Sequence, residues 1–121
     1  MEIDEILPKK SQEGIKIIEK LLKAMHSDIK DLINYENLEK KSKKIETKVT
    51  RITKIALTLE STLDNENGGE ISENLNKLYQ HIRFAALRAY EDHDFSFLES
   101  ADKVCNEIND GWTKMLKAAA A

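Results

Sequence analysis

Residues 49–82 read VTRITKIALTLESTLDNENGGEISENLNKLYQHI and are the most informative part of the chain. Before the glycines, apolar residues recur three or four positions apart, at Val49, Ile52, Ala56, Leu59 and Leu63. The same spacing resumes after them, at Ile71, Leu75, Leu78 and Ile82. Side chains at this spacing form one stripe along a helix. The intervening DNENGG supplies residues that tolerate the positive φ of a helix end and a tight turn. The stretch therefore predicts two helices joined by a short turn.

Two further segments carry the same periodicity. One stripe runs through Ile15, Ile18, Leu22, Met25, Ile29 and Leu32, and another through Leu98, Ala101, Cys105, Ile108, Trp112 and Met115. We predict helices at about 11–33, 37–64, 70–91 and 95–117, within a single domain over 1–121. The fold class is all-α, an antiparallel up-down bundle of four main helices. A dimer of a coiled-coil hairpin is the alternative, but the first and third stripes are wider than a two-helix seam needs.

Composition and charge narrow the classes of function. The 121 residues are 40% hydrophobic and 34% charged, with a net charge of −3 and one cysteine. No apolar run approaches the ~18 residues of a membrane span, and the acidic N-terminus lacks the features of a signal peptide. We expect a cytoplasmic, reduced protein without membrane insertion. A basic stretch over 40–54 is either a solvated helix face or a contact for an anionic partner. No aromatic residue lies between Tyr35 and Tyr79, so stacking on single-stranded nucleic acid is unsupported. Neither half of the chain resembles a nucleic-acid binder, which usually concentrates basic charge on one face, and no nucleic-acid partner is expected.

Residues with catalytic potential are few. No histidine follows a glutamate by three positions, as a di-iron bundle site requires, and one cysteine cannot build a structural zinc site. Cys105 lies on the apolar stripe of the last helix, where a thiol is typically a small hydrophobe with a raised pKa. We therefore expect no metal, no cofactor and no enzymatic activity. An enzyme that uses Cys105 with His81 or His93 is the distant alternative.

The turn and its flanks carry a resemblance to a known family. The segment 61–71, STLDNENGGEI, continues through Asn74-Leu75 to Leu78-Tyr79, and a tryptophan follows at 112. This pattern resembles the FliS-type flagellin export chaperones, and the match covers about residues 55–116. Seven residues of the motif are expected to be architectural: Asp64, Gly68, Gly69, Glu70, Leu75, Leu78 and Trp112.

The resemblance implies a function. Members are cytoplasmic helical bundles that bind the disordered C-terminal segment of flagellin, prevent its early polymerisation and deliver it for export. It implies a one-to-one complex with flagellin and no cofactor, and it leaves other flagellar export or regulatory proteins open as partners. The alternative from another class is a non-catalytic structural or regulatory bundle, with a different client or with self-association.

A client segment that folds on binding needs apolar grooves between helices. The candidates are the apolar residues beyond the narrow stripes: Tyr79, Ile17, Leu21, Ile55, Tyr90, Phe97 and Val104. Ordinary core packing is the alternative for each of them. Tyr79 is the first choice because it belongs to the motif and offers both a ring and a hydroxyl.

Overall fold

The computed structural model describes residues 11–63 and 69–120, and the side chains of 14–63 and 69–114. This part of the chain contains helices and no strands. The helices are α2 (Ser11–Ile33), α3 (Lys43–Ser61), α4 (Gly69–Glu91) and α5 (Leu98–Ala120). The prediction of an all-α bundle is confirmed. No helix in the described ranges is long and apolar enough to cross a membrane.

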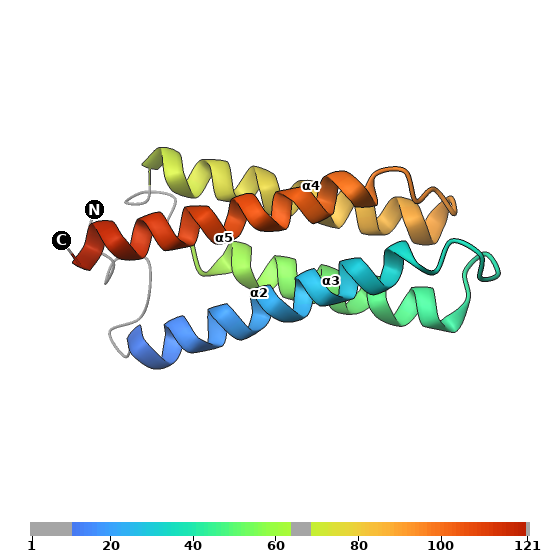
Figure 1. Cartoon of the computed structure of the whole chain (residues 1–121), viewed down its shortest axis with the longest axis horizontal. Helices are drawn as coiled ribbons and strands as arrows, with labels where there is room; N and C mark the ends of the chain where they lie inside the picture. The colour runs from blue at the N-terminus through green and yellow to red at the C-terminus, as the bar shows by residue number, and fades with distance from the viewer. Residues whose placement is uncertain (1–10, 64–68, 121) are drawn as a thin grey trace.

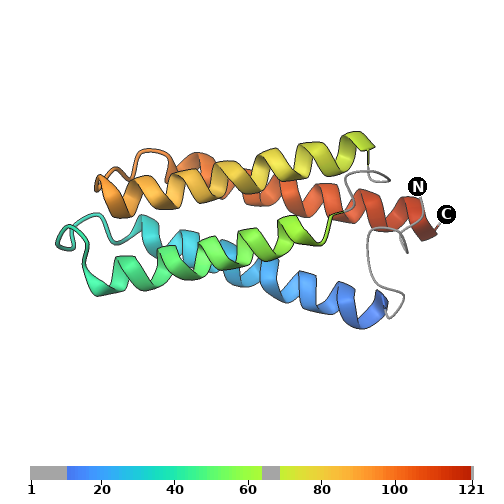
Figure 2. The same cartoon turned by 180° about the vertical axis from the view of Figure 1, so that it is seen from behind.

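The four helices lie side by side with their long axes roughly aligned (Figure 1). α2 packs against α3 and α5, and α4 packs against the same two helices. Each helix therefore has two close neighbours, and the pair α2/α3 forms the face opposite the pair α4/α5 (Figure 2). Short loops reverse the chain between α2 and α3 and between α4 and α5, which makes neighbours antiparallel.

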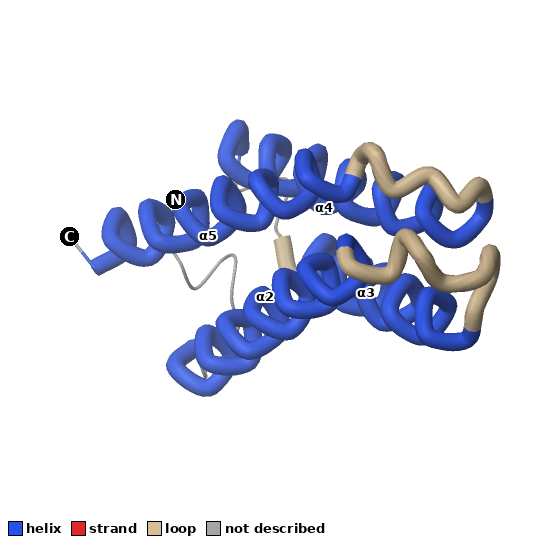
Figure 3. Tube along the Cα trace, turned by 45° about the vertical axis from the view of Figure 1, so that its right-hand side comes forward, coloured by secondary structure: helices blue, strands red, loops and turns tan. Residues whose placement is uncertain are grey.

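The two described loops meet at one end of the bundle (Figure 3). The His93 ring Nε2 lies 2.9 Å from the backbone carbonyl of Glu36, to which it donates a hydrogen bond. The His93 ring also meets the Phe95 ring edge-on, with centroids 4.9 Å apart. These contacts join the loop between α4 and α5 to the loop between α2 and α3.

Helix α3 begins later than the predicted start at 37. Residues 34–41 form turns instead, and Lys41 has a left-handed φ of 59° that an α-helix cannot contain. The helix begins at Lys43 because Ser42 is its N-cap: the Ser42 hydroxyl accepts a hydrogen bond from the Ile45 N–H at 3.3 Å. The apolar Leu38, which suggested an earlier start, packs against the core from the loop.

Helix α5 also begins after its predicted start at 95. The Asp94 carboxylate accepts hydrogen bonds from the Ser96 backbone N–H at 3.0 Å and from the Ser96 hydroxyl at 2.6 Å. Both hydrogen bonds lower the pKa of Asp94, and the bond from the Ser96 hydroxyl has the larger effect. They hold residues 94–96 in a turn, and the helix starts at Leu98. The predicted ranges of α2 and α4 agree with the structure within one residue.

Most residues of the predicted stripes are buried in the core, whereas Ile71 is 40% exposed. Fully buried large side chains from all four helices are Met25, Ile29, Leu32, Ile45, Ile52, Leu59, Tyr79, Ile82, Leu98 and Ile108. α4 faces the core with three alanines, Ala85, Ala86 and Ala89. Small side chains at these positions allow neighbouring helices to approach closely.

Candidate functional site

A hollow lies between α4 and α5 on one face of the bundle. It encloses about 420 Å³. We call it the α4–α5 groove, and its lining residues are Ile71, Asn74, Leu75, Lys77, Leu78, Glu107 and Gly111. Gly111 helps to open it, because a Cβ at that position would stand 3.2 Å from Leu75 Cδ2. Ile71 is 40% exposed, so a large apolar side chain at the groove already faces solvent.

Aromatic residues continue this apolar surface toward the loop end. The Phe84 ring on α4, which is 46% exposed, meets the Phe97 ring edge-on with centroids 5.0 Å apart. Beside them, His81 Nε2 lies 3.0 Å from the Ser100 hydroxyl, a hydrogen bond between α4 and α5. Val104 lies on α5 one turn beyond Ser100, at the edge of the core. Exposed apolar side chains thus occur at two places on the α4–α5 face, at Ile71 and at Phe84.

A second hollow lies between α2 and α3, on the opposite face. It encloses about 550 Å³. We call it the α2–α3 groove, and its lining residues are Leu21, Ala24, Lys43, Glu46, Thr47, Thr50, Arg51, Lys54 and Ile55. Ile17 stands one helical turn before Leu21 and therefore on the same side of α2. It is 58% exposed. This groove combines an apolar base with a basic edge.

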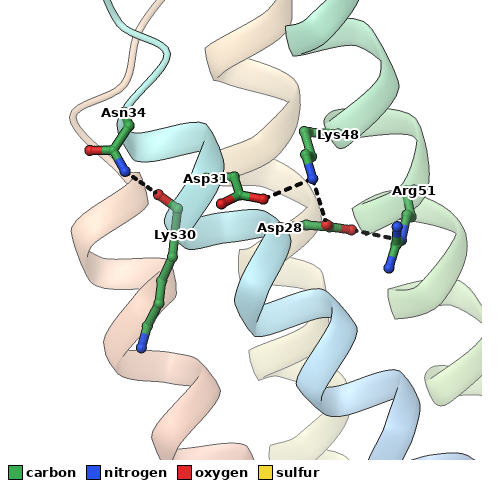
Figure 4. A network of polar contacts seen from close by, with 6 residues as sticks. All are labelled: Asp28, Lys30, Asp31, Asn34, Lys48 and Arg51. Carbon is green, nitrogen blue, oxygen red and sulfur yellow. Dashed lines mark hydrogen bonds and ion pairs between the residues drawn. The ribbon is translucent and has the colours of Figure 1, made fainter.

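A polar network borders the α2–α3 groove (Figure 4). The carboxylate of Asp28 is buried on α2, and its Oδ1 lies 3.2 Å from Lys48 Nζ. Its Oδ2 lies 3.0 Å from Arg51 Nε. These two atoms form an ion pair, but their alignment does not meet the geometry of a hydrogen bond. Lys48 Nζ also reaches Asp31 Oδ2 at 2.8 Å. The hydrogen bond to Asp31 is the main reason why the pKa of Lys48 is raised.

The sequence candidates separate between the two faces and the core. Leu21 and Ile55 both line the α2–α3 groove, and Ile17 extends it. Phe97 and Val104 lie on the α4–α5 face, where Phe97 contacts Phe84. Of these candidates, Leu21 and Ile55 are the two that the fold brings together from distant parts of the chain.

Two tyrosine candidates lie elsewhere. Tyr79 is completely buried, and its hydroxyl accepts a 2.6 Å hydrogen bond from the Trp112 indole Nε1. Burial raises the pKa of Tyr79. Its ring therefore has no exposed surface to offer a client, and its client-binding role stays a prediction. Tyr90 is half-buried, and Lys41 Nζ lies 5.5 Å from the centre of its ring.

Several surface residues were missed by sequence reasoning. Ile71 fell on the stripe assigned to the core, yet it lines the groove exposed. Phe84 stands on none of the stripes, and an aromatic residue off the stripe was the signal that could have found it. Gly111 gave no signal, because its effect depends on Leu75 of another helix.

The motif residues have the following places. Asp64 and Gly68 lie outside the described residues. Gly69 has a φ of +55° at the first residue of α4, a conformation that glycine adopts without strain. Glu70 lies in the first turn, where a negative charge suits the helix dipole. Leu75 and Trp112 are buried and Leu78 is partly buried, so these three support the bundle from α4 and α5.

The Cys105 thiol is poorly suited to act as a nucleophile. Cys105 is buried, and burial raises the pKa of its thiol to about 12. A neutral, covered thiol is a poor nucleophile. Within the described residues, no three histidine, cysteine or acidic side chains gather as metal ligands would. The exposed apolar grooves are therefore the candidate functional site.

Comparisons with known proteins agree with the resemblance seen in the sequence. The chain matches the family described as flagellar protein FliS over residues 10–119. It is 33% identical over 54 residues to the flagellar secretion chaperone FliSB of Pseudomonas aeruginosa, a match that covers 45% of this chain and 43% of that relative. The chain thus spans less than half the length of the curated relative. No solved structure matches it.

Proposed function

The chain belongs to the FliS family of flagellar proteins, and we propose from that membership that it is a cytoplasmic flagellar export chaperone without enzymatic activity. Its client is the C-terminal segment of flagellin, which it binds one-to-one and keeps from premature polymerisation. The curated relative carries the name of a flagellar secretion chaperone, which supports this role. Other flagellar export or regulatory proteins remain open as further partners.

The observation that carries the proposal is the apolar surface between α4 and α5. Ile71, which lines the hollow beside Gly111, is 40% exposed, and Phe84, farther along α4, is 46% exposed. An amphipathic helix docks on such a surface through residues at i, i+3, i+4 and i+7. Burying this surface supplies the free energy that offsets the ordering of a disordered client. The α4–α5 groove is thus the first docking site that we assign to flagellin.

The test is a calorimetric titration of the full chain with the C-terminal segment of flagellin from the same organism. We expect saturable one-to-one binding with a negative heat-capacity change, the signature of apolar burial with folding. The variants Ile71→Glu and Phe84→Glu should each lower the affinity by about tenfold or more, as loss of an apolar anchor does. Both side chains are largely outside the core, so the melting temperature should stay close to that of the wild type.

Leu57→Glu is the matched control. Leu57 is a similarly exposed apolar residue, at 49%, but it lies on α3, away from the α4–α5 groove. Its substitution should leave the affinity unchanged. An equal loss for Leu57→Glu and Ile71→Glu would contradict the proposed location, and no binding by the wild type would contradict the proposed client.

Exposed apolar residues also fit a bundle that associates with itself. Sedimentation at increasing concentration separates the two functions. The chaperone is expected to stay monomeric and to form a one-to-one complex. Growth of a dimer at micromolar concentration, lost in Ile71→Glu, would instead favour the structural role.

A further inference from the structure

The α2–α3 groove differs from the α4–α5 groove in charge. Residues 40–54 contain seven lysines and arginines and one acidic residue, Glu46, in a chain whose net charge is −3. Three of these cations, Lys43, Arg51 and Lys54, line the α2–α3 groove together with one anion, Glu46. The α4–α5 groove is lined by one cation, Lys77, and one anion, Glu107. Only the α2–α3 groove therefore presents an excess of positive charge beside apolar residues.

The buried carboxylate of Asp28 positions Arg51 at this edge. The ion pair uses Arg51 Nε, the nitrogen nearest the stem, and the side chain stays 56% exposed. A guanidinium has five N–H donors, so its terminal nitrogens remain for a carboxylate from outside. Asp28 thus holds the Arg51 guanidinium in place before a partner binds.

The other two cations are open to solvent. Lys43 reaches Glu46 at 3.3 Å but is 85% exposed, so this pair is weak. The backbone carbonyl of Lys54 accepts a hydrogen bond from the Thr58 hydroxyl at 2.8 Å, whereas its ammonium group is exposed and forms no ion pair with another described residue. Lys43, Arg51 and Lys54 are spaced by eight and three residues along α3, so they form a row on one side of that helix.

The base of the groove is apolar. Leu21 and Ala24 on α2 face Ile55 on α3, and the exposed Ile17 extends the row by one turn. Two adjacent antiparallel helices with such a seam can receive a third helix through its own apolar stripe. The row of cations then lies along one flank of the bound helix.

We propose that the α2–α3 groove binds an amphipathic helix of a partner protein whose apolar stripe is flanked by glutamate or aspartate. Charge complementarity with Lys43, Arg51 and Lys54 selects this partner against neutral or basic helices. The site lies on the face opposite the α4–α5 groove, so both can be occupied together. The inference goes beyond the proposed function, because it holds whichever protein the α4–α5 groove binds.

The test uses three labelled synthetic helices, each as long as α3, and fluorescence anisotropy with the full chain. The first carries a leucine stripe flanked by glutamates, the second the same stripe flanked by lysines, and the third the glutamates with serines in place of leucines. We expect the first to bind about tenfold more tightly than either of the others, from several weak ion pairs and an apolar stripe acting together. Its affinity should fall as salt is raised.

Charge-reversal variants of the protein test whether the first helix binds in the α2–α3 groove. Lys54→Glu should weaken the first helix by about threefold or more and strengthen the lysine-flanked helix. Lys103→Glu, at an exposed lysine of α5 that lines neither groove, is the matched control and should change neither. Both lysines are exposed, and melting curves verify that each variant is folded.

Several results would overturn the inference. These are equal binding of the glutamate-flanked and lysine-flanked helices, equal effects of Lys54→Glu and Lys103→Glu, and no binding of the first helix. Binding to phosphatidylserine vesicles or to duplex DNA without binding to the first helix would also overturn it. A chain that binds the flagellin segment but not the acidic helix loses this inference and keeps the proposed function.

Discussion

The Trp112 indole Nε1 on α5 donates a 2.6 Å hydrogen bond to the hydroxyl of Tyr79 on α4, and both side chains are buried. The bond satisfies the polar atom of each ring where no water reaches it. Tyr79 therefore joins two helices inside the bundle, and this contact gives a physical reason for having both residues in the motif. Sequence reasoning had assigned Tyr79 first to client binding.

We expect Tyr79→Phe to lower the free energy of unfolding by about 1–3 kcal/mol, because it leaves the Trp112 N–H buried without its acceptor. Tyr79→Ala should cost about 3–5 kcal/mol, since a cavity is added. Chemical denaturation followed by Trp112 fluorescence measures both. Tyr90→Phe is the control and should change stability by less than about 0.5 kcal/mol.

The outcome for client binding separates the two roles of Tyr79. If it acts only in the fold, Tyr79→Phe should bind the flagellin segment as the wild type does at a temperature where both are folded. A large loss of affinity in a fully folded Tyr79→Phe would restore Tyr79 as a client contact.

Cys105 should be unreactive in the folded chain. Its thiol is buried and its pKa is raised to about 12, so near neutral pH it is neutral and covered. An aromatic disulfide reagent at about pH 8 should modify it many times faster in concentrated guanidinium chloride than in buffer. Rapid modification of the native protein would contradict the burial and would reopen the enzymatic alternative.

Stability should fall at alkaline pH. The Cys105 pKa rises from an ordinary 9.0 to about 12 on folding, so the unfolded chain loses the proton first. The contribution of the neutral thiol is complete below pH 9 and is lost as pH rises from about 9 to about 12, at up to about 1.4 kcal/mol per pH unit. Tyr79, whose pKa burial also raises, acts in the same direction. Melting curves across this range should be less steep in pH for Cys105→Ala.

The carboxylate of Asp28 should stabilise the junction of α2 and α3. Asp28→Asn leaves Lys48 and Arg51 near each other without a shared anion, and we expect a loss of about 1–3 kcal/mol, reduced because Arg51 is largely solvated. Asp31→Asn, at the more exposed end of the network, is the control and should cost less. Equal losses of unfolding free energy for the two variants, measured by denaturation, would show that the burial of Asp28 does not determine its contribution to stability.

The interactions of Lys48 stabilise the folded chain over a defined pH range. Its pKa is raised above 10.5 in the folded state, mainly through Asp31. Its stabilising contribution is therefore complete below that pH and is lost as pH rises through the raised value. In Asp31→Asn this alkaline loss should shrink.

Gly111 should matter more for binding than for folding. Gly111→Ala gains up to about 1 kcal/mol of helix propensity, but the new Cβ would stand 3.2 Å from Leu75 Cδ2, which must shift. We expect a net change in stability within about 1 kcal/mol and a weaker complex with the flagellin segment, since the α4–α5 groove becomes shallower. Asn109→Ala, at an exposed position of the same helix, is the control. An unchanged affinity for Gly111→Ala would place the client elsewhere.

Much of the fold could be predicted because helix periodicity is a local property. The stripe from Ile18 to Leu32 is buried as predicted, and Gly69 takes the positive φ that its turn requires. The start of α3 could not be predicted from periodicity, because Leu38 continues the apolar pattern into the loop before the helix. A hydroxyl at Ser42, which caps the helix, outweighs that pattern.

The sequence by itself determined the four helices and which side of each one faces inward, because the spacing of apolar residues along a helix sets both. Only the tertiary structure decided which residues beside those stripes stay exposed, because that depends on the side chains of the neighbouring helix. Trp112 covers Tyr79, whereas Gly111 leaves a hollow beside Leu75 and Ile71. The binding surfaces are therefore properties of helix pairs, and no single helix carries them in its sequence alone.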